Sequence, residues 1–179
     1  MARQKIVPQA AVQVCNRQKT RRLNLPLLRQ LARRILEELP PARGQSGAKK
    51  SLPANGQLAV YFIHAAEMAR LNEQFLGHAG STDVITFDYQ EDAAPDGWIG
   101  EIFVSVDDAV AAAPRFRASW QLELARYIVH GMLHLHGCDD LRPAARREMK
   151  KEENRLLKAL SRSFDWRKLE KVHYAARQK

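Results

Sequence analysis

The sequence predicts an α+β domain in which helices pack on a small mixed β-sheet of about four strands. Strand-like segments dominate its first part and long helical patterns its second part, which is typical of this fold class. The 179 residues suffice for one domain with a substantial core, and no internal repeat is apparent. We therefore expect a single domain over residues 1–179.

Four segments have the pattern of β-strands. Residues 10–16 alternate weakly between apolar and polar side chains, whereas residues 57–63 and 99–106 are largely apolar. Residues 83–88 complete the set. The segment 90–97 is polar and rich in turn-forming residues, which predicts a hairpin with a long loop between the last two strands.

Five segments have the periodicity or the capping residues of helices. The first carries an apolar stripe, with Asn24 as N-cap and Pro26 in its first turn. Ser119 caps a later helix that carries two histidines, and Pro143 opens the last helix. The expected helices cover residues 25–39, about 65–76, about 107–115, the segment from Ser119 through His134, and 143 to about 160.

Two segments are expected to be flexible. Residues 40–56 are rich in Pro, Gly, Ser, Ala and Lys, which predicts a flexible loop inside the domain. Residues 167–179 are basic and predict a flexible tail, and Phe164 and Trp166 extend the packing just before it.

The overall charge indicates a polyanionic partner. The chain carries 29 Lys and Arg against 20 Asp and Glu, a net charge of +9, which favours nucleic acid. A basic surface with charged ends is the alternative interpretation. Neither a signal peptide nor an apolar run of about 18 residues is visible, so we expect no membrane association. Two cysteines, Cys15 and Cys138, give no disulfide framework, which favours a reducing cytoplasm.

The run from His130 to Asp140 predicts a metal site at the end of a central helix. Two histidines four residues apart project from one helix face, about 5–6 Å apart, as two ligands of one ion must. Gly137 offers a helix stop, after which the chain can return with a third ligand. Asp140 is the preferred third ligand, with Asp139 and His136 as rivals, and a pair of packed core histidines is the structural alternative. An open fourth position leaves room for an activated water.

Gly131 weighs against a peptidase. Zinc proteases of the HExxH type carry a glutamate next to the first histidine as general base. This chain has glycine at that position, so a protease base would have to come from elsewhere.

Three blocks of the sequence resemble the YbeY family of bacterial metal-dependent endoribonucleases and ribosomal RNA maturation factors. The first is the His130 run, which is similar to the family's HGxLHLxGxDH. The second, Leu71-Asn72 followed by Ser81 to Phe87, is similar to LN…PTDVLSF, and the third is Gly100-Glu101-Ile102 for GDI. The resemblance spans about residues 57–157. The first block matches at His130, Gly131, Leu133, His134, Leu135, Gly137 and Asp139.

The resemblance implies a zinc-dependent endoribonuclease. His130, His134 and Asp140 would hold one Zn²⁺ ion whose water attacks a phosphodiester of single-stranded RNA, and they are the expected catalytic residues. The implied role is maturation of small-subunit ribosomal RNA, with the small subunit and its proteins as partners. A non-catalytic ribosome-assembly factor with a structural metal, and a metal hydrolase of another substrate such as peptide, are the alternatives.

Two positions depart from the family pattern. Asp140 stands where the family has its final histidine, and a carboxylate still binds zinc. Leu76 stands where the family has an arginine thought to face RNA. Arg70, Arg115 and Arg117 are the candidate substitutes, and Thr82 with Asp83 either line the cleft or form a turn. Glu101 is a further acid beside the site, or an ordinary solvated side chain. Cys138 is interpreted as a packing residue.

Overall fold

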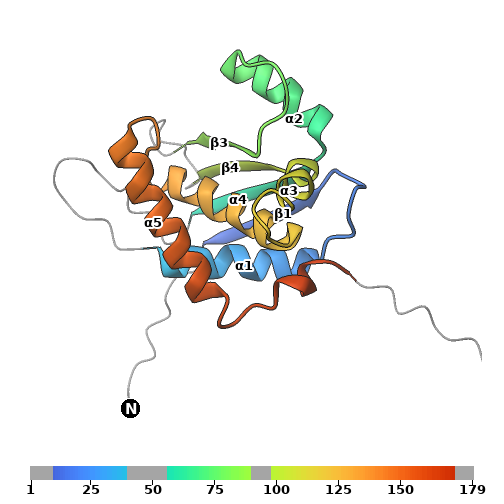
Figure 1. Cartoon of the computed structure of the whole chain (residues 1–179), viewed down its shortest axis with the longest axis vertical. Coiled ribbons are helices and arrows are strands. Elements are labelled where there is room, and N and C mark those ends of the chain that lie inside the picture. The colour runs from blue at the N-terminus through green and yellow to red at the C-terminus, as the bar shows by residue number, and fades with distance from the viewer. Residues whose placement is uncertain (1–9, 40–55, 90–97, 172–179) are drawn as a thin grey trace, which may run out of the picture.

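A four-stranded mixed sheet forms the centre of the molecule (Figure 1). The computed structural model describes residues 10–39, 56–89 and 98–171. The strands are β1 (Ala11–Asn16), β2 (Gln57–Ile63), β3 (Val84–Asp88) and β4 (Trp98–Ser105), in the order β1-β2-β4-β3. β1, β2 and β4 are parallel, and β3 pairs antiparallel with β4. The predicted α+β class, the four strands and the hairpin pairing are confirmed; the hairpin loop 90–97 lies outside the described residues.

The helices follow the predicted order, and their capping residues act as expected. Asn24 accepts the backbone N–H of Leu27, and Ser119 accepts that of Leu122. The third helix ends before the predicted residue 115, because Pro114 has no N–H to continue the helical hydrogen bonds. The helices are α1 (Leu25–Glu38), α2 (Ala65–Leu71), α3 (Val106–Ala112), α4 (Trp120–Leu135) and α5 (Pro143–Leu160), with a π-helical turn η1 (Asn72–Leu76) and a 3-10 turn η2 (Trp166–Leu169).

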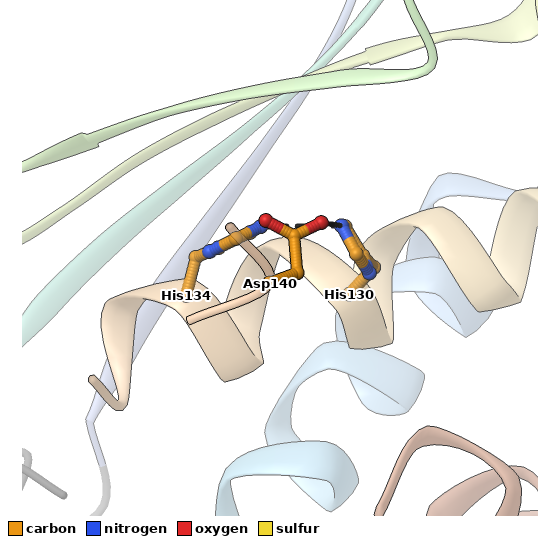
Figure 2. Close-up of side chains that lie close together, drawn as sticks. All are labelled: His130, His134 and Asp140. Atoms are coloured by element: carbon orange, nitrogen blue, oxygen red, sulfur yellow. Dashed lines mark hydrogen bonds and ion pairs between the residues drawn. The ribbon is translucent and has the colours of Figure 1, made fainter. Parts of the chain in front are cut away.

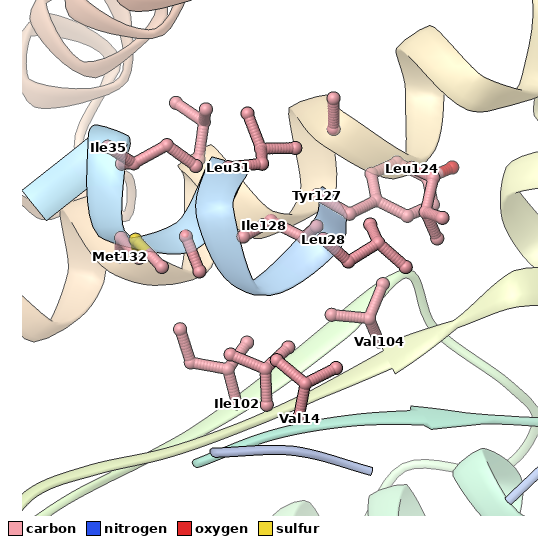
Figure 3. Packing of buried hydrophobic residues seen from close by; sticks show 14 of the residues in the cluster. Val14, Leu28, Leu31, Ile35, Ile102, Val104, Leu124, Tyr127, Ile128 and Met132 are labelled. Atoms are coloured by element: carbon pink, nitrogen blue, oxygen red, sulfur yellow. The ribbon is translucent and has the colours of Figure 1, made fainter. Parts of the chain in front are cut away.

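The main core lies between one face of the sheet and the helices α1 and α4. Figure 3 shows strand residues such as Ile102 and Val104 below side chains of both helices. Leu31, Ile35 and Ile128 are fully buried in this layer. α4 is buried on almost every side, since α1, α3, α5 and the sheet all pack against it. This central helix carries both histidines of the motif.

A smaller apolar cluster lies on the opposite face of the sheet, beneath α2. It joins Met68 of α2 to Ile63, Ile85 and Phe103 of the strands. The predicted helix over residues 65–76 is divided here, because the chain continues as the π-helical turn η1 and ends at Gly77 in the left-handed conformation, with φ of +68°.

The C-terminal segment is ordered further than the sequence suggests. The tail was expected to begin at about residue 167, but η2 buries Leu169 completely, and the backbone N–H of Lys171 donates to Arg22 at 2.7 Å. The buried Leu169 holds this segment against the domain, although its composition is that of a charged, flexible tail. Residues 172–179 and 40–55 lie outside the described residues. No helix within the described ranges combines the length and hydropathy needed to cross a bilayer.

Candidate metal centre

The two histidines occupy successive turns at the end of α4, and Asp140 returns beside them. α4 ends because Gly137 adopts φ of +86°, a conformation that glycine accepts readily. The N–H groups of Gly137 and Cys138 then donate to the carbonyls of His134 and Leu133 at 2.8 and 2.9 Å. This tight turn reverses the chain, and Figure 2 shows the polar ends of the three side chains meeting at one point.

The three side chains have the spacing of metal ligands. His130 Nε2 lies 3.1 Å from His134 Nε2 and 3.9 Å from Asp140 Oδ2, and all three ligand atoms lie within 4.8 Å of one another. Atoms that are each about 2.0–2.2 Å from a tetrahedral ion lie about 3.3–3.6 Å apart. The two distances from His130 Nε2, 3.1 and 3.9 Å, each differ from that range by a few tenths of an ångström.

The hydrogen bonds of the two rings prepare both for a cation. His134 Nδ1 lies 3.2 Å from the Cys138 carbonyl, and His130 Nδ1 lies 3.4 Å from Glu153 Oε2. Both partners can only accept, so each hydrogen bond places a proton on Nδ1 and turns Nε2 of the ring toward the shared point. Burial, together with the nearby His130, lowers the pKa of His134 and keeps that ring neutral. Two Nε2 atoms 3.1 Å apart, with a carboxylate oxygen beside them, can share one cation, and the donor set therefore fits a divalent metal.

Glu153 of α5 is the residue that sequence reasoning missed. Its side chain is only 5% exposed and accepts hydrogen bonds from Arg126 Nη1 at 2.6 Å and Lys150 Nζ at 2.7 Å, besides facing His130. Burial raises the pKa of Glu153, but the hydrogen bonds from His130, Lys150 and Arg126 outweigh it and lower the pKa to about 2. The carboxylate is thus ionised and fixes the tautomer of His130. The sequence does hold one indication that Glu153 is buried: it lies in the apolar stripe of α5, four residues after Met149.

The rivals for the third ligand lie elsewhere. His136 is 2% exposed within the core, and Asp139 accepts the backbone N–H of Leu141 at 3.0 Å, as a turn-forming aspartate does. Among the described residues, the group that can share an ion comprises His130, His134 and Asp140. Cys138 packs against the core, as expected.

A pocket of about 280 Å³ opens beside this group. His130 and Asp140 form part of its wall. Asp83 lines it as well, and also accepts the backbone N–H of Val84 at 3.0 Å, so that its cleft role and its local capping role coexist. Thr82 donates to Asp83 at 3.0 Å. Glu101 lies outside the pocket lining and accepts the hydroxyls of two tyrosines on the sheet. The other lining residues are Phe116, Glu123, Arg126, Tyr127, Arg146, Met149, Lys150 and Glu153.

The basic residues proposed as substitutes for the family arginine divide into two groups. Leu76 is 53% exposed on η1, and Arg70 lies at the end of α2; neither lines the pocket. Arg115 and Arg117 flank Phe116, which does line it. Arg146, which belongs to none of the three family-like blocks, is itself part of the wall.

Gly131 faces the sheet, which gives a steric reason for its identity. A Cβ atom there would lie 2.8 Å from Cγ2 of the fully buried Ile102, and 3.1 and 3.2 Å from methyl groups of Val84 and Thr86. A glutamate at this position would point into the core rather than toward the ligands. The fold therefore disfavours the peptidase alternative at this position.

We expect Gly131→Ala to lower the free energy of unfolding by about 1–2 kcal/mol. Overpacking a core costs about 1–3 kcal/mol, and the better helix propensity of alanine offsets up to about 1 kcal/mol of that loss. Urea unfolding followed by circular dichroism measures the difference. An unchanged or higher midpoint would show that α4 and the sheet separate without cost.

Comparisons with known proteins agree on one family. A family model described as Endoribonuclease YbeY matches residues 13–161. An Endoribonuclease YbeY from Chlorobium phaeovibrioides is 36% identical over 126 residues, covering 68% of this chain and 83% of the relative. Another from Salinibacter ruber is 39% identical over 97 residues, covering 51% and 62%. The solution structure of TM1509 from Thermotoga maritima matches with a TM-score of 0.56 and 22% identity, over 93% of this chain and 99% of that one, and shows the same fold.

Proposed function

The chain belongs to the Endoribonuclease YbeY family, and on that premise we propose that it is a metal-dependent endoribonuclease whose ion is Zn²⁺, held by His130, His134 and Asp140. The observation that carries the metal dependence is the pair of imidazole Nε2 atoms 3.1 Å apart, with the Asp140 carboxylate beside them. Two histidines and a carboxylate are a zinc-binding donor set that leaves a coordination position open.

The chain's own residues bind and orient the RNA. A bound zinc ion would polarise a phosphoryl oxygen and lower the pKa of water. Asp140 adds a negative charge that a third histidine would not, which makes this site less electrophilic than a three-histidine site. Glu153 holds the His130 ring, and the basic chain together with the bound ion would attract the phosphate backbone.

We further propose that the substrate is single-stranded precursor RNA of the small ribosomal subunit, processed in the cytoplasm with ribosomal proteins as partners. The family membership and the net charge of +9 support this role. Because Leu76 replaces an arginine of the family pattern, a second function is the alternative: a non-catalytic assembly factor with a structural metal.

Elemental analysis of purified wild type and Asp140→Ala, with RNA cleavage measured on the same samples, tests the proposal. We expect about one zinc ion per wild-type chain, and a loss of about 100-fold or more in both zinc affinity and cleavage in the variant, because one of three ligands is removed. Asp139→Ala is the matched control: it removes the same side chain one position earlier and should keep both properties.

Three outcomes contradict parts of the proposal. Zinc loss in Asp139→Ala but not in Asp140→Ala would overturn the ligand assignment. Cleavage by wild-type protein that holds no metal would overturn metal dependence. Zinc binding without RNA cleavage, together with co-sedimentation with ribosomal subunits, would establish the non-catalytic assembly factor instead.

A further inference from the structure

We propose that the pocket beside the metal group is a subsite for one unpaired nucleotide, whose base stacks on Phe116 and whose phosphate is bound by Arg146. The subsite rests on the proposed endoribonuclease function, since it positions the strand next to His130 and Asp140. Three independent features of the pocket lead to it: an exposed aromatic ring, an arginine with uncommitted donors, and the balance of charge.

Phe116 is an aromatic ring held out toward solvent at the edge of the pocket. It is 67% exposed and lies in the turn between α3 and α4. Backbone hydrogen bonds of 2.9–3.3 Å fix this turn, and Arg117 adopts φ of +52°, which is uncommon outside glycine. The other exposed phenylalanine among the described residues, Phe75, packs edge-on against Phe87. Phe116 makes no such ring contact within the described part of the chain, so its face is open to a base.

Arg146 makes one side-chain hydrogen bond within the described part of the chain and keeps its other N–H groups available for a ligand. Its Nε donates to the backbone carbonyl of Asp140 at 3.0 Å, which anchors the guanidinium beside a proposed ligand. Arg126 and Lys150, the other two cations of the wall, are both committed to Glu153. The terminal amino groups of Arg146 have no ion-pair partner among the described residues. They can therefore bind two phosphate oxygens as a fork.

The charge of the pocket makes phosphate binding depend on the ion. Its three Lys and Arg side chains face four carboxylates, so that these seven groups together carry a net charge of −1. A divalent ion changes this to +1. A phosphate is therefore attracted only when the metal group is loaded, and the bound phosphate comes to lie next to the ion. The four carboxylates are Asp83, Glu123, Asp140 and Glu153.

The size of the pocket selects a single, unpaired nucleotide. A volume of about 280 Å³ lies at the lower limit of ligand pockets, which is too small for a base pair. A base reaches an aromatic side chain only when it leaves its stack, as it does in single strands, loops and bulges. The subsite thus gives a physical reason for preference for single-stranded RNA.

Fluorescence anisotropy with a short single-stranded RNA, measured on zinc-loaded protein over a range of salt concentrations, tests the subsite. We expect Phe116→Leu to weaken binding by about 5- to 150-fold without changing the salt dependence, because it removes stacking alone. Arg146→Ala should weaken binding and also lower the slope of log affinity against log salt by about 0.7, because one phosphate contact is lost. Removing zinc from the wild type should weaken binding as well.

Phe75→Leu and Arg147→Ala are the matched controls, since both residues are exposed and lie outside the pocket. Zinc content and melting temperature should remain at wild-type values in all four variants. Wild-type affinity in both Phe116→Leu and Arg146→Ala, in protein that binds zinc and cleaves RNA, would overturn the subsite and leave the proposed function intact. A wild type that neither binds zinc nor cleaves RNA would overturn the proposed function itself.

Discussion

A variant carrying both His130→Ala and His134→Ala is expected to bind no zinc and to cleave RNA only at background level while remaining folded. The two rings supply two of the three ligand atoms, and Asp140 alone, with a side chain 35% exposed, can offer only a hydrated carboxylate. The core around α4 is formed by other side chains, among them Leu124, Ile128 and Met132. The loss should therefore concern metal and activity rather than the fold.

Thermal unfolding separates these two effects. Zinc at about 100 times its dissociation constant stabilises a one-site protein by about 2.7 kcal/mol, which corresponds to a rise of about 5–11 °C in the melting temperature of a domain of this size. The wild type should show that rise, and the double variant should show none. His78→Ala is the matched control, since His78 is exposed and lies outside the ligand group. A full zinc-dependent rise in the double variant would falsify the assignment of these histidines as ligands.

Local patterns in the sequence were sufficient to predict most of the fold. The N-caps Asn24 and Ser119, the stripe of α1 and the apolar strands each act within a few residues, so their signals survive in the linear chain. The two histidines of α4 were predictable for the same reason, because a helix fixes their relative positions. The extent of the tail was not, because Leu169 is anchored by contacts with residues far away in the sequence.

The residues that surround the ligands depend on which helices pack against each other, and local sequence patterns do not predict that packing. Glu153 reaches His130 only because α5 packs against α4, and the four-residue spacing within α5 gives no indication of the partner helix. Phe116 looks like an ordinary turn residue until the turn is placed beside the pocket. The sequence left three candidates for the third ligand because the path of the chain after Gly137 could not be predicted. In the structure that turn brings Asp140 within 4.8 Å of the histidine nitrogens, which is why Asp140 is the proposed ligand.

Replacing Glu153 with glutamine is expected to weaken both the fold and the metal site. The substitution keeps the volume of the side chain but removes the charge that accepts from Arg126 and Lys150, at 2.6 and 2.7 Å. Breaking a buried ion pair costs about 3–5 kcal/mol, and we expect about 2–3 kcal/mol here, because Arg126 and Lys150 are 22% and 56% exposed and keep part of their hydration. Zinc affinity should fall about 10- to 100-fold, because the partner that fixes a ligating histidine no longer carries its charge.

Zinc affinity distinguishes a positioning role from a merely structural one. Measured by competition with a chelator at a temperature where each protein is fully folded, it should fall in Glu153→Gln and stay unchanged in Glu152→Gln. The control alters the neighbouring side chain of α5, which pairs with Arg155 and does not contact the ligand group. If Glu153→Gln lost stability but bound zinc as the wild type does, Glu153 would serve only the packing of α5 on α4. A loss of zinc affinity larger than the control's shows that this buried carboxylate, through His130, helps to hold the ion.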